Sequence, residues 1–161
     1  EINVSEDIII KTIRDNFQKK ILNISDLFKN FNKEESDIIK MASIVEEEAR
    51  TIETRGIIAG ILWRRLDLGM PLQVDASFKY INGKGTKDLT LADLKIDSPY
   101  NSYLYKGLPP TPISNPGLDS IVATLTPIKT DYLYFLTDKE GNMHYAKTFS
   151  EHVFNKQKYL P

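Results

Sequence analysis

The spacing of hydrophobic residues predicts helices over the N-terminal half of the chain. Apolar residues recur at helical spacing in three successive segments, 9–21, 38–52 and 57–66. Ser5 precedes the first segment as a potential N-cap, and Asn32 with Glu35 three residues later forms a capping-box signal before the second. Gly69 and then Pro71 mark the end of the third.

Two glycines interrupt the third helical segment. Gly56 and Gly60 are four residues apart, and each costs a soluble helix roughly 1 kcal/mol relative to alanine. Such a cost usually accompanies a close backbone contact. We expect this contact to be with the preceding helix.

The pattern changes after residue 70. Short turns rich in Pro and Tyr extend to Gly117, and Asn115 as cap with Pro116 at the first position then predicts another helix towards Pro127. A strand at 132–136, a turn at 138–142, a hairpin partner at 143–148 and a short helix to Tyr159 follow. The predicted class is α+β: a helical N-terminal half, a loop-rich middle, a short C-terminal hairpin and a terminal helix, in one domain over 1–161.

Composition excludes several classes of function. A net charge of -1 gives no general attraction to nucleic acid or anionic lipid. The absence of Cys excludes disulfides and thiolate chemistry. His144 and His152 show no metal-ligand spacing and are interpreted as structural, and no cofactor motif is present, so we expect neither a metal nor a cofactor.

Three consecutive glutamates, Glu46 to Glu48, lie near the end of the second helical segment. At about 100° per residue, Glu47 points directly away from the apolar stripe, while Glu46 and Glu48 lie on its two flanks. Glu46 stands beside Ile39 and Ala42, where a side chain can enter an adjoining cleft. A solvated acidic face is the ordinary interpretation of such a run, so spacing alone does not select one carboxylate.

A resemblance to a known family does select one. The chain resembles the YceG-like endolytic murein transglycosylases over roughly residues 38 to 160, through five motifs in the family's order: Ala42-Ser43-Ile44-Val45-Glu46, Arg65-Leu66, Gly69-Met70-Pro71-Leu72-Gln73-Val74-Asp75, Tyr100-Asn101-Ser102-Tyr103 and Gly107-Leu108-Pro109-Pro110. The resemblance implies that Glu46 is the catalytic acid. Members usually carry an N-terminal membrane anchor, so we expect this chain to be part of a longer protein anchored at the outer face of a bacterial membrane.

The resemblance also places a glycan cleft in the loop-rich middle. The expected substrate-binding residues are Gln73, Asp75, Tyr100, Asn101, Tyr103, Leu108, Pro109 and Asn115. Each has a structural alternative: a loop brace for Gln73, a helix cap for Asp75 and Asn115, and core packing for each Tyr.

The chain departs from the family after the glutamate run. Members often have Glu-Arg eight and nine residues beyond the catalytic Glu, whereas this chain has Thr54-Arg55, with Glu53 one position early. No site role is assigned to Glu53.

The implied reaction is endolytic cleavage of the MurNAc–GlcNAc bond to leave 1,6-anhydro-MurNAc ends, possible with one carboxylate acting first as acid and then as base. Such an acid needs a raised pKa, which partial burial of Glu46 would supply. Peptidoglycan strands are the expected substrate and peptidoglycan synthases the expected protein partners. The alternatives are a non-enzymatic glycan-binding or scaffold domain, and a hydrolytic muramidase with Asp75 as second carboxylate.

Overall fold

The computed structural model describes residues 4–160. The chain divides into two compact units at Lys33, and the second, from Glu34 onwards, holds most of the fold. The sequence-based expectation of one catalytic domain over 1–161 stays a prediction.

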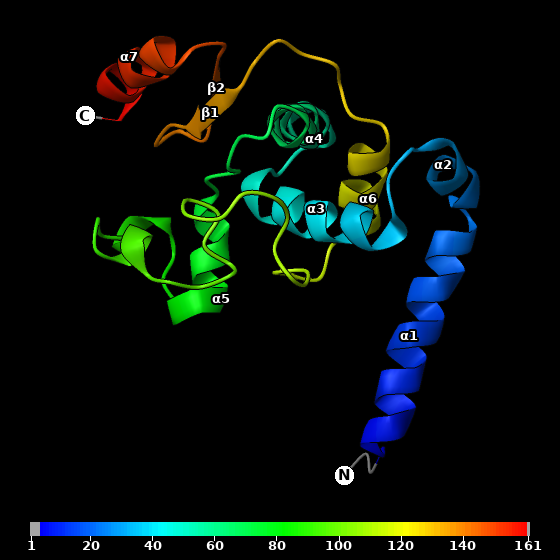
Figure 1. Ribbon diagram of the computed structural model, residues 1–161. Helices are drawn as coiled ribbons and strands as arrows, with labels where there is room; N and C mark the ends of the chain where they lie inside the picture. The colour runs from blue at the N-terminus through cyan, green and yellow to red at the C-terminus, as the bar shows by residue number, and fades with distance from the viewer. Residues whose placement is uncertain (1–3, 161) are drawn as a thin grey trace. The chain divides into compact units, whose positions relative to one another are not determined.

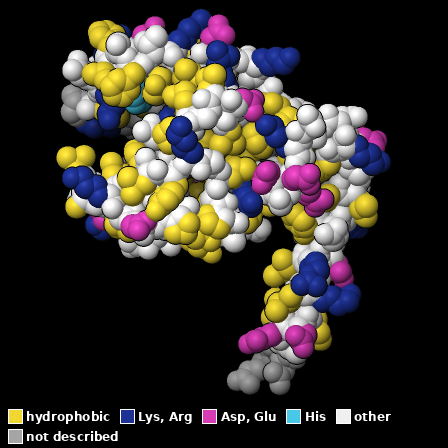
Figure 2. All heavy atoms as spheres, in the orientation of Figure 1, with side chains coloured by type: hydrophobic (Ala, Val, Ile, Leu, Met, Phe, Trp, Pro, Cys, Tyr) yellow, Lys and Arg dark blue, Asp and Glu magenta, His cyan; other side chains and the backbone are white. Residues whose placement is uncertain are grey.

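The first unit is a pair of helices. Helix α1 spans Glu6–Leu22 and α2 spans Ser25–Asn30, with Ser5 at the predicted N-cap position of α1 but without a capping hydrogen bond from its side chain. Neither helix buries a residue, and hydrophobic side chains are visible along α1 (Figure 2). In the part of the chain that is described, no helix combines the length and the apolar character needed to span a bilayer.

Three helices form the centre of the second unit: α3 (Glu35–Glu48), α4 (Ile52–Asp67) and α6 (Leu118–Leu125). They pack against one another, as the cyan, green and yellow helices of Figure 1 show. Their facing sides supply most of the core: Ile38, Met41, Ile44, Val45, Ile58, Ile61, Leu62 and Ile121. The helical spacing of these residues is therefore explained by burial.

Two predicted helix starts are wrong. Glu34 is the N-cap of α3 and has no side-chain cap, so the expected capping box of Asn32 and Glu35 does not form. Helix α6 begins after Gly117 rather than after Asn115, whose side chain is exposed.

The two glycines of α4 allow a close approach, as predicted, but the partner is not α3. The amide of Ile128 donates to the Gly56 carbonyl at 3.0 Å. A Cβ atom built on Gly60 would lie 2.1 Å from the carbonyl oxygen of Ile128. The segment after α6 therefore crosses α4 at these glycines, and this crossing requires the absence of a side chain.

Short elements connect α4 to α6. They are η1 (Asp75–Ser77), α5 (Phe78–Asn82), η2 (Thr86–Asp88) and η3 (Asp93–Lys95), followed by irregular chain to residue 117. Element η1 packs against α3. The beginning of the loop-rich region is thereby held beside the C-terminal half of the glutamate-bearing helix.

The chain ends in the predicted hairpin and helix. Strand β1 (Tyr134–Thr137) pairs antiparallel with β2 (Met143–Ala146), and α7 (Phe149–Tyr159) packs on both strands. Thr148 and Glu151 form a capping box at the start of α7. The α+β class is confirmed.

Candidate active site

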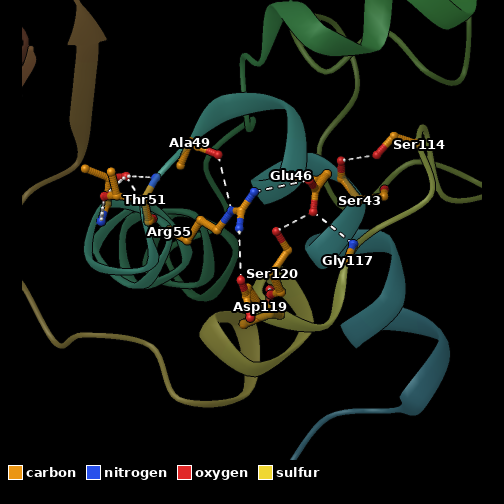
Figure 3. Close-up of polar contacts among 11 residues, drawn as sticks. Ser43, Glu46, Ala49, Thr51, Arg55, Ser114, Gly117, Asp119 and Ser120 are labelled. Carbon is orange, nitrogen blue, oxygen red and sulfur yellow. Dashed lines mark hydrogen bonds and ion pairs between the residues drawn. The ribbon is translucent and has the colours of Figure 1, made fainter. Parts of the chain in front are cut away.

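Glu46 is bound on three sides in the structure. Arg55 Nη2 donates to Oε1 at 3.1 Å, while the Gly117 amide and the Ser120 hydroxyl donate to Oε2 at 2.9 and 2.7 Å (Figure 3). Arg55 also donates from Nε to the carbonyl of Ala49. Because these donors come from α4 and from the start of α6, the carboxylate joins all three central helices.

The expected rise in the pKa of Glu46 is wrong. Burial raises the pKa, but the hydrogen bonds from Ser120 and Gly117 and the charge of Arg55 together outweigh it, so the pKa lies below its ordinary value. Three donors aimed at one carboxylate favour its ionised form. A lowered pKa reduces the fraction of Glu46 that carries a proton near neutral pH, and a general acid needs that proton.

Glu48 has the opposite electrostatic setting. It lies in the last turn of α3 and is only partly exposed. Burial and the charge of Asp75 raise the pKa of Glu48 to about 7, a smaller contribution from Glu47 acts in the same direction, and the Ala76 amide opposes them. A carboxyl group with a pKa near 7 can exchange its proton at neutral pH, so Glu48 is a candidate acid and base.

Asp75 borders Glu48 and is held by a tyrosine. The Tyr103 hydroxyl donates to Asp75 Oδ1 at 2.6 Å. Burial, this hydrogen bond and the charges of Asp75 and Glu48 raise the pKa of Tyr103 well above its ordinary value, so the phenol keeps its proton. Val74, not Asp75, precedes η1, and the Asp75 side chain makes no capping bond there. The helix-cap alternative for Asp75 is therefore wrong.

Gln73 lies at the edge of the same cluster. Its side-chain oxygen accepts from Arg65 Nη2 at 2.5 Å, and its backbone amide donates to the carbonyl of Ser102 at 3.0 Å. The Val74 amide in turn donates to the Ser102 hydroxyl at 3.0 Å. Segment 73–75 is thus tied to segment 102–103, which brings two of the resemblance motifs together.

The remaining predicted cleft residues divide into two groups. Tyr100, Leu108 and Pro109 line a small pocket together with Ile44 and Val74. Tyr100 also stacks against Tyr80, with ring centroids 4.6 Å apart.

Asn101, by contrast, is 0% exposed and donates to the carbonyls of Leu94 and Ile96 while accepting from the Tyr103 amide. Its amide braces the loop and presents no surface to a glycan. Asn115 is exposed but lies in the chain just before α6, and no hydrogen bond from its side chain is seen among residues 4–160.

Ser43 ties the loop-rich region to α3. This fully buried residue accepts from the Ile113 amide at 3.0 Å, and its carbonyl accepts from the Ser114 hydroxyl at 2.8 Å (Figure 3). The segment that follows Pro109 is therefore fixed, through Ile113 and Ser114, to the same helix as the glutamates.

Five residues of this arrangement were not predicted as site residues from the sequence: Glu48, Arg55, Arg65, Gly117 and Ser120. Arg65 belongs to a quoted motif, and Arg55 lies at the family's usual distance from Glu46, so the signal for both was present. Glu53 lies near Tyr145, and its charge adds to the effect of burial in raising the pKa of that tyrosine. Among the described residues, no three His, Cys, Asp or Glu side chains gather as a metal site would require.

Several known proteins are similar to this chain. It is 46% identical over 123 residues to the endolytic murein transglycosylase of Bacillus subtilis (strain 168), a match that covers 76% of this chain and 34% of that protein. It is 38% identical over 133 residues to the endolytic murein transglycosylase of Streptococcus pneumoniae serotype 2, covering 79% of this chain and 24% of that protein.

A solved structure agrees with these matches. The crystal structure of a yceG-like protein from Listeria monocytogenes superimposes with a TM-score of 0.88 at 35% identity, covering 96% of this chain and 50% of that one. This chain thus spans half or less of each of these relatives. The model of the YceG-like family matches residues 1–158, and the chain belongs to that family.

Proposed function

We propose that this chain carries the catalytic part of an endolytic lytic transglycosylase that cleaves MurNAc–GlcNAc bonds within peptidoglycan strands, with Glu48 as general acid and then general base. The observation that carries the proposal is the pKa of Glu48, raised by burial and by Asp75 to about 7. Similar proteins named endolytic murein transglycosylase support the choice of substrate.

Glu48 supplies the proton that the leaving oxygen needs. A carboxylic acid with a pKa near the working pH is protonated in a large fraction of molecules, yet its conjugate base is strong enough to take a proton back. After the glycosidic bond breaks, the Glu48 carboxylate accepts the proton of the 6-hydroxyl as that oxygen bonds to C1 of the same sugar. The proton balance closes without a water molecule, and the product is a 1,6-anhydro end.

Asp75 favours the protonated form of Glu48 and, in this account, faces the positive charge that develops on the sugar. Its negative charge raises the pKa of Glu48, after the larger effect of burial. The same charge stabilises an oxocarbenium-like centre, which a glycosidase must do. The Tyr103 hydroxyl fixes the Asp75 carboxylate through the 2.6 Å hydrogen bond. Asp75 and Glu48 are therefore a pair with divided roles.

Glu46 has a positioning role in this account. Its ionised carboxylate holds the C-terminal end of α3 against Arg55 and Ser120, at 3.1 and 2.7 Å. Glu48 follows two residues later, in the last turn of α3. The motif glutamate singled out by the resemblance thus secures the helix end that carries the acid.

The small pocket that Val74, the neighbour of Asp75, helps to line forms part of the glycan-binding surface in this account. Tyr100 and Tyr105 offer aromatic rings, and Leu108 and Pro109 offer apolar walls. Aromatic rings stack on the apolar faces of sugars.

The cellular setting follows from the substrate. Peptidoglycan lies outside the cytoplasm, so we place the site at the outer face of the cell membrane, in an anchored full-length protein that works with peptidoglycan synthases and ends nascent strands.

One alternative is favoured by a specific observation. The sequence offered a single credible carboxylate, whereas the structure places Asp75 close enough to Glu48 for their charges to interact. Two carboxylates are also what a hydrolytic muramidase uses, with the second activating water or forming a covalent intermediate.

The nature of the product tests the proposal. Purified peptidoglycan is digested by the full-length protein in water enriched in ¹⁸O, and the fragments are analysed by mass. Anhydro ends, one water lighter and without label, are expected. Labelled reducing ends would show a muramidase, and intact glycan that remains bound to the protein would show a non-enzymatic binding domain.

A further inference from the structure

The backbone of Gln73 adopts a conformation that side chains normally avoid. Among residues 4–160 it is the sole non-glycine residue with a positive φ, 52°. A β-carbon is disfavoured in this region, and such residues gather at binding and catalytic sites where surrounding contacts hold them in place. Here the contacts are the hydrogen bond from the Gln73 amide to Ser102 and the bond from Arg65 to the side-chain oxygen.

Arg65 fixes which way the Gln73 amide points. A guanidinium group has only donors, so the atom that faces it at 2.5 Å must be the carbonyl oxygen of the amide. Arg65 is only 4% exposed, and its other bonds go to the carbonyls of Pro71 and Leu133, at 3.0 and 3.3 Å. The buried guanidinium cannot turn away, and the Gln73 amide therefore cannot flip.

The fixed orientation leaves the NH2 group of Gln73 available to a ligand. Gln73 is exposed, and none of the hydrogen bonds among the described residues involves its Nε2. Gln73 is two residues before Asp75 and is bonded to Arg65, while Tyr103 is bonded to Asp75, so Gln73 and Arg65 belong to the same cluster as Asp75. The site thus presents a donor that cannot become an acceptor.

A donor of this kind discriminates only against groups that cannot accept. A sugar hydroxyl both donates and accepts, so either face of an amide serves it. A carbonyl oxygen only accepts, so it can bind the NH2 group of Gln73 but could not bind an amide that presented its own oxygen. The fixed orientation of Gln73 therefore matters for a carbonyl ligand. Of the groups on the glycan backbone of peptidoglycan, the acetamido carbonyls meet this description.

We propose that Arg65 acts as a positioning residue that locks the Gln73 amide, so that Gln73 Nε2 donates to an acetamido carbonyl of the glycan and selects N-acetylated strands. The proposal rests on the proposed function for its substrate class. It assigns to Gln73 a specificity that is separate from the proton chemistry of Glu48.

Gln73→Glu is the sharpest variant. A carboxylate keeps the acceptor that Arg65 requires and adds an opposite charge beside a buried cation, so the fold is retained. The donor towards the ligand is replaced by an acceptor. We expect an unchanged or higher melting temperature, a KM for N-acetylated glycan about tenfold higher, and a kcat within a few-fold of wild type. Gln157→Glu makes the same chemical change at an exposed position of α7 and should leave both constants unchanged.

The comparison of acetylated with chemically N-deacetylated glycan identifies the ligand atom. Wild-type protein should bind the acetylated strand at least tenfold more tightly, and Gln73→Glu should lose or reverse this preference. Gln73→Gly, which accommodates a positive φ and removes the side chain, should lose the preference while remaining folded. A preference that survives both substitutions would overturn the proposal.

Binding and cleavage separate this proposal from the proposed function. Affinities are measured by calorimetry with the full-length Glu48→Gln protein, with and without Gln73→Glu, so that no turnover is needed. Absent cleavage by wild-type protein would reject the proposed function and still allow the preference to be read. Cleavage by wild type, with equal affinities in the two Glu48→Gln proteins, would reject the role of Gln73 alone.

Discussion

Glu48 at the end of α3 and Asp75 at the start of η1 lie close enough for their charges to interact. Burial together with the charge of Asp75 raises the pKa of Glu48 to about 7. Two residues earlier, Glu46 is held ionised by Arg55, Gly117 and Ser120. Two glutamates on one helix thus have pKa values shifted in opposite directions by their surroundings.

The first prediction concerns which of the three consecutive glutamates is the catalytic acid. Glu48→Gln should abolish glycan cleavage, with a loss of about 10²- to 10⁴-fold or more, because it removes the transferable proton and preserves size. Glu47→Gln is the matched control and should retain activity, since Glu47 is exposed and pairs with Lys79 at the surface. Cleavage rates and melting temperatures are compared for all variants. Full activity in a folded Glu48→Gln protein would return the acid role to Glu46.

The second prediction concerns stability. Glu46→Gln should destabilise the fold by about 1–3 kcal/mol, because the charged acceptor shared by Arg55, Gly117 and Ser120 is lost. The pKa of Glu46 is lowered in the fold, so this stabilisation is present above its unfolded value of 4.5 and is lost as the pH falls below it. Urea titrations at pH 7 and pH 3 measure the difference. An equal loss of stability at both values would contradict the ionised state assigned to Glu46.

The third prediction concerns the pH dependence of stability. The pKa of Glu48 is raised from 4.5 to about 7, so the folded state binds the proton more tightly than the unfolded state does. The linked stabilisation is present below pH 4.5 and is lost as the pH rises through 7. Above pH 7 Glu48→Gln should therefore be more stable than wild type, by on the order of 2 kcal/mol, and this gain should shrink towards pH 4. Unfolding curves at several pH values test it, and a gain independent of pH would exclude a raised pKa.

The fourth prediction concerns the pH dependence of activity. Cleavage requires protonated Glu48, so kcat/KM should fall as the pH rises above about 7. Asp75→Asn removes a charge that raises the pKa of Glu48. The pH at which kcat/KM falls should therefore be lower in this variant, with residual activity at acidic pH. An Asp75→Asn protein that is folded, binds glycan and is inactive at every pH would indicate that Asp75 takes part in covalent or water-activating chemistry.

The fifth prediction tests the crossing over α4. Gly60→Ala places a methyl group 2.1 Å from the backbone oxygen of Ile128 and should cost about 3 kcal/mol or more. Gly56→Ala meets the Ile128 side chain at 3.1 Å, which can shift, and should cost less. Alanine is the better helix former by roughly 1 kcal/mol, so equal gains of stability in thermal melts would show that helix propensity, and not the close approach, decides the outcome.

The sequence was sufficient for features set by local periodicity. Helices α1, α3 and α4, the hairpin and α7 follow from residue spacing, because their apolar faces are buried or repeat over several turns. Capping signals were less informative. Asn32 and Asn115 are good caps in isolation, but the chain continues in an extended or irregular conformation past both before a helix begins.

The candidate site depends on contacts that periodicity does not encode. The helical projection placed Glu46 and Glu48 on opposite flanks of α3, and both flanks are indeed covered by other segments. Glu46, on one flank, accepts a hydrogen bond from Ser120, whereas Glu48, on the other flank, lies near the carboxylate of Asp75. The pKa values of the two glutamates follow from those partners, and the sequence gives no direct sign of either.

The bonds that surround Glu46 also connect distant parts of the chain. Gly117 and Ser120 lie 71 and 74 residues beyond Glu46, and Ile113 lies 70 residues beyond Ser43. Closing loops of this length costs chain entropy before any contact is gained, so such contacts tend to form late in folding. During synthesis, helix α3 is therefore complete well before the residues that fix its C-terminal end have been made. The network around Glu46 should therefore be completed only after Ser120 has been made and α6 has packed against α3.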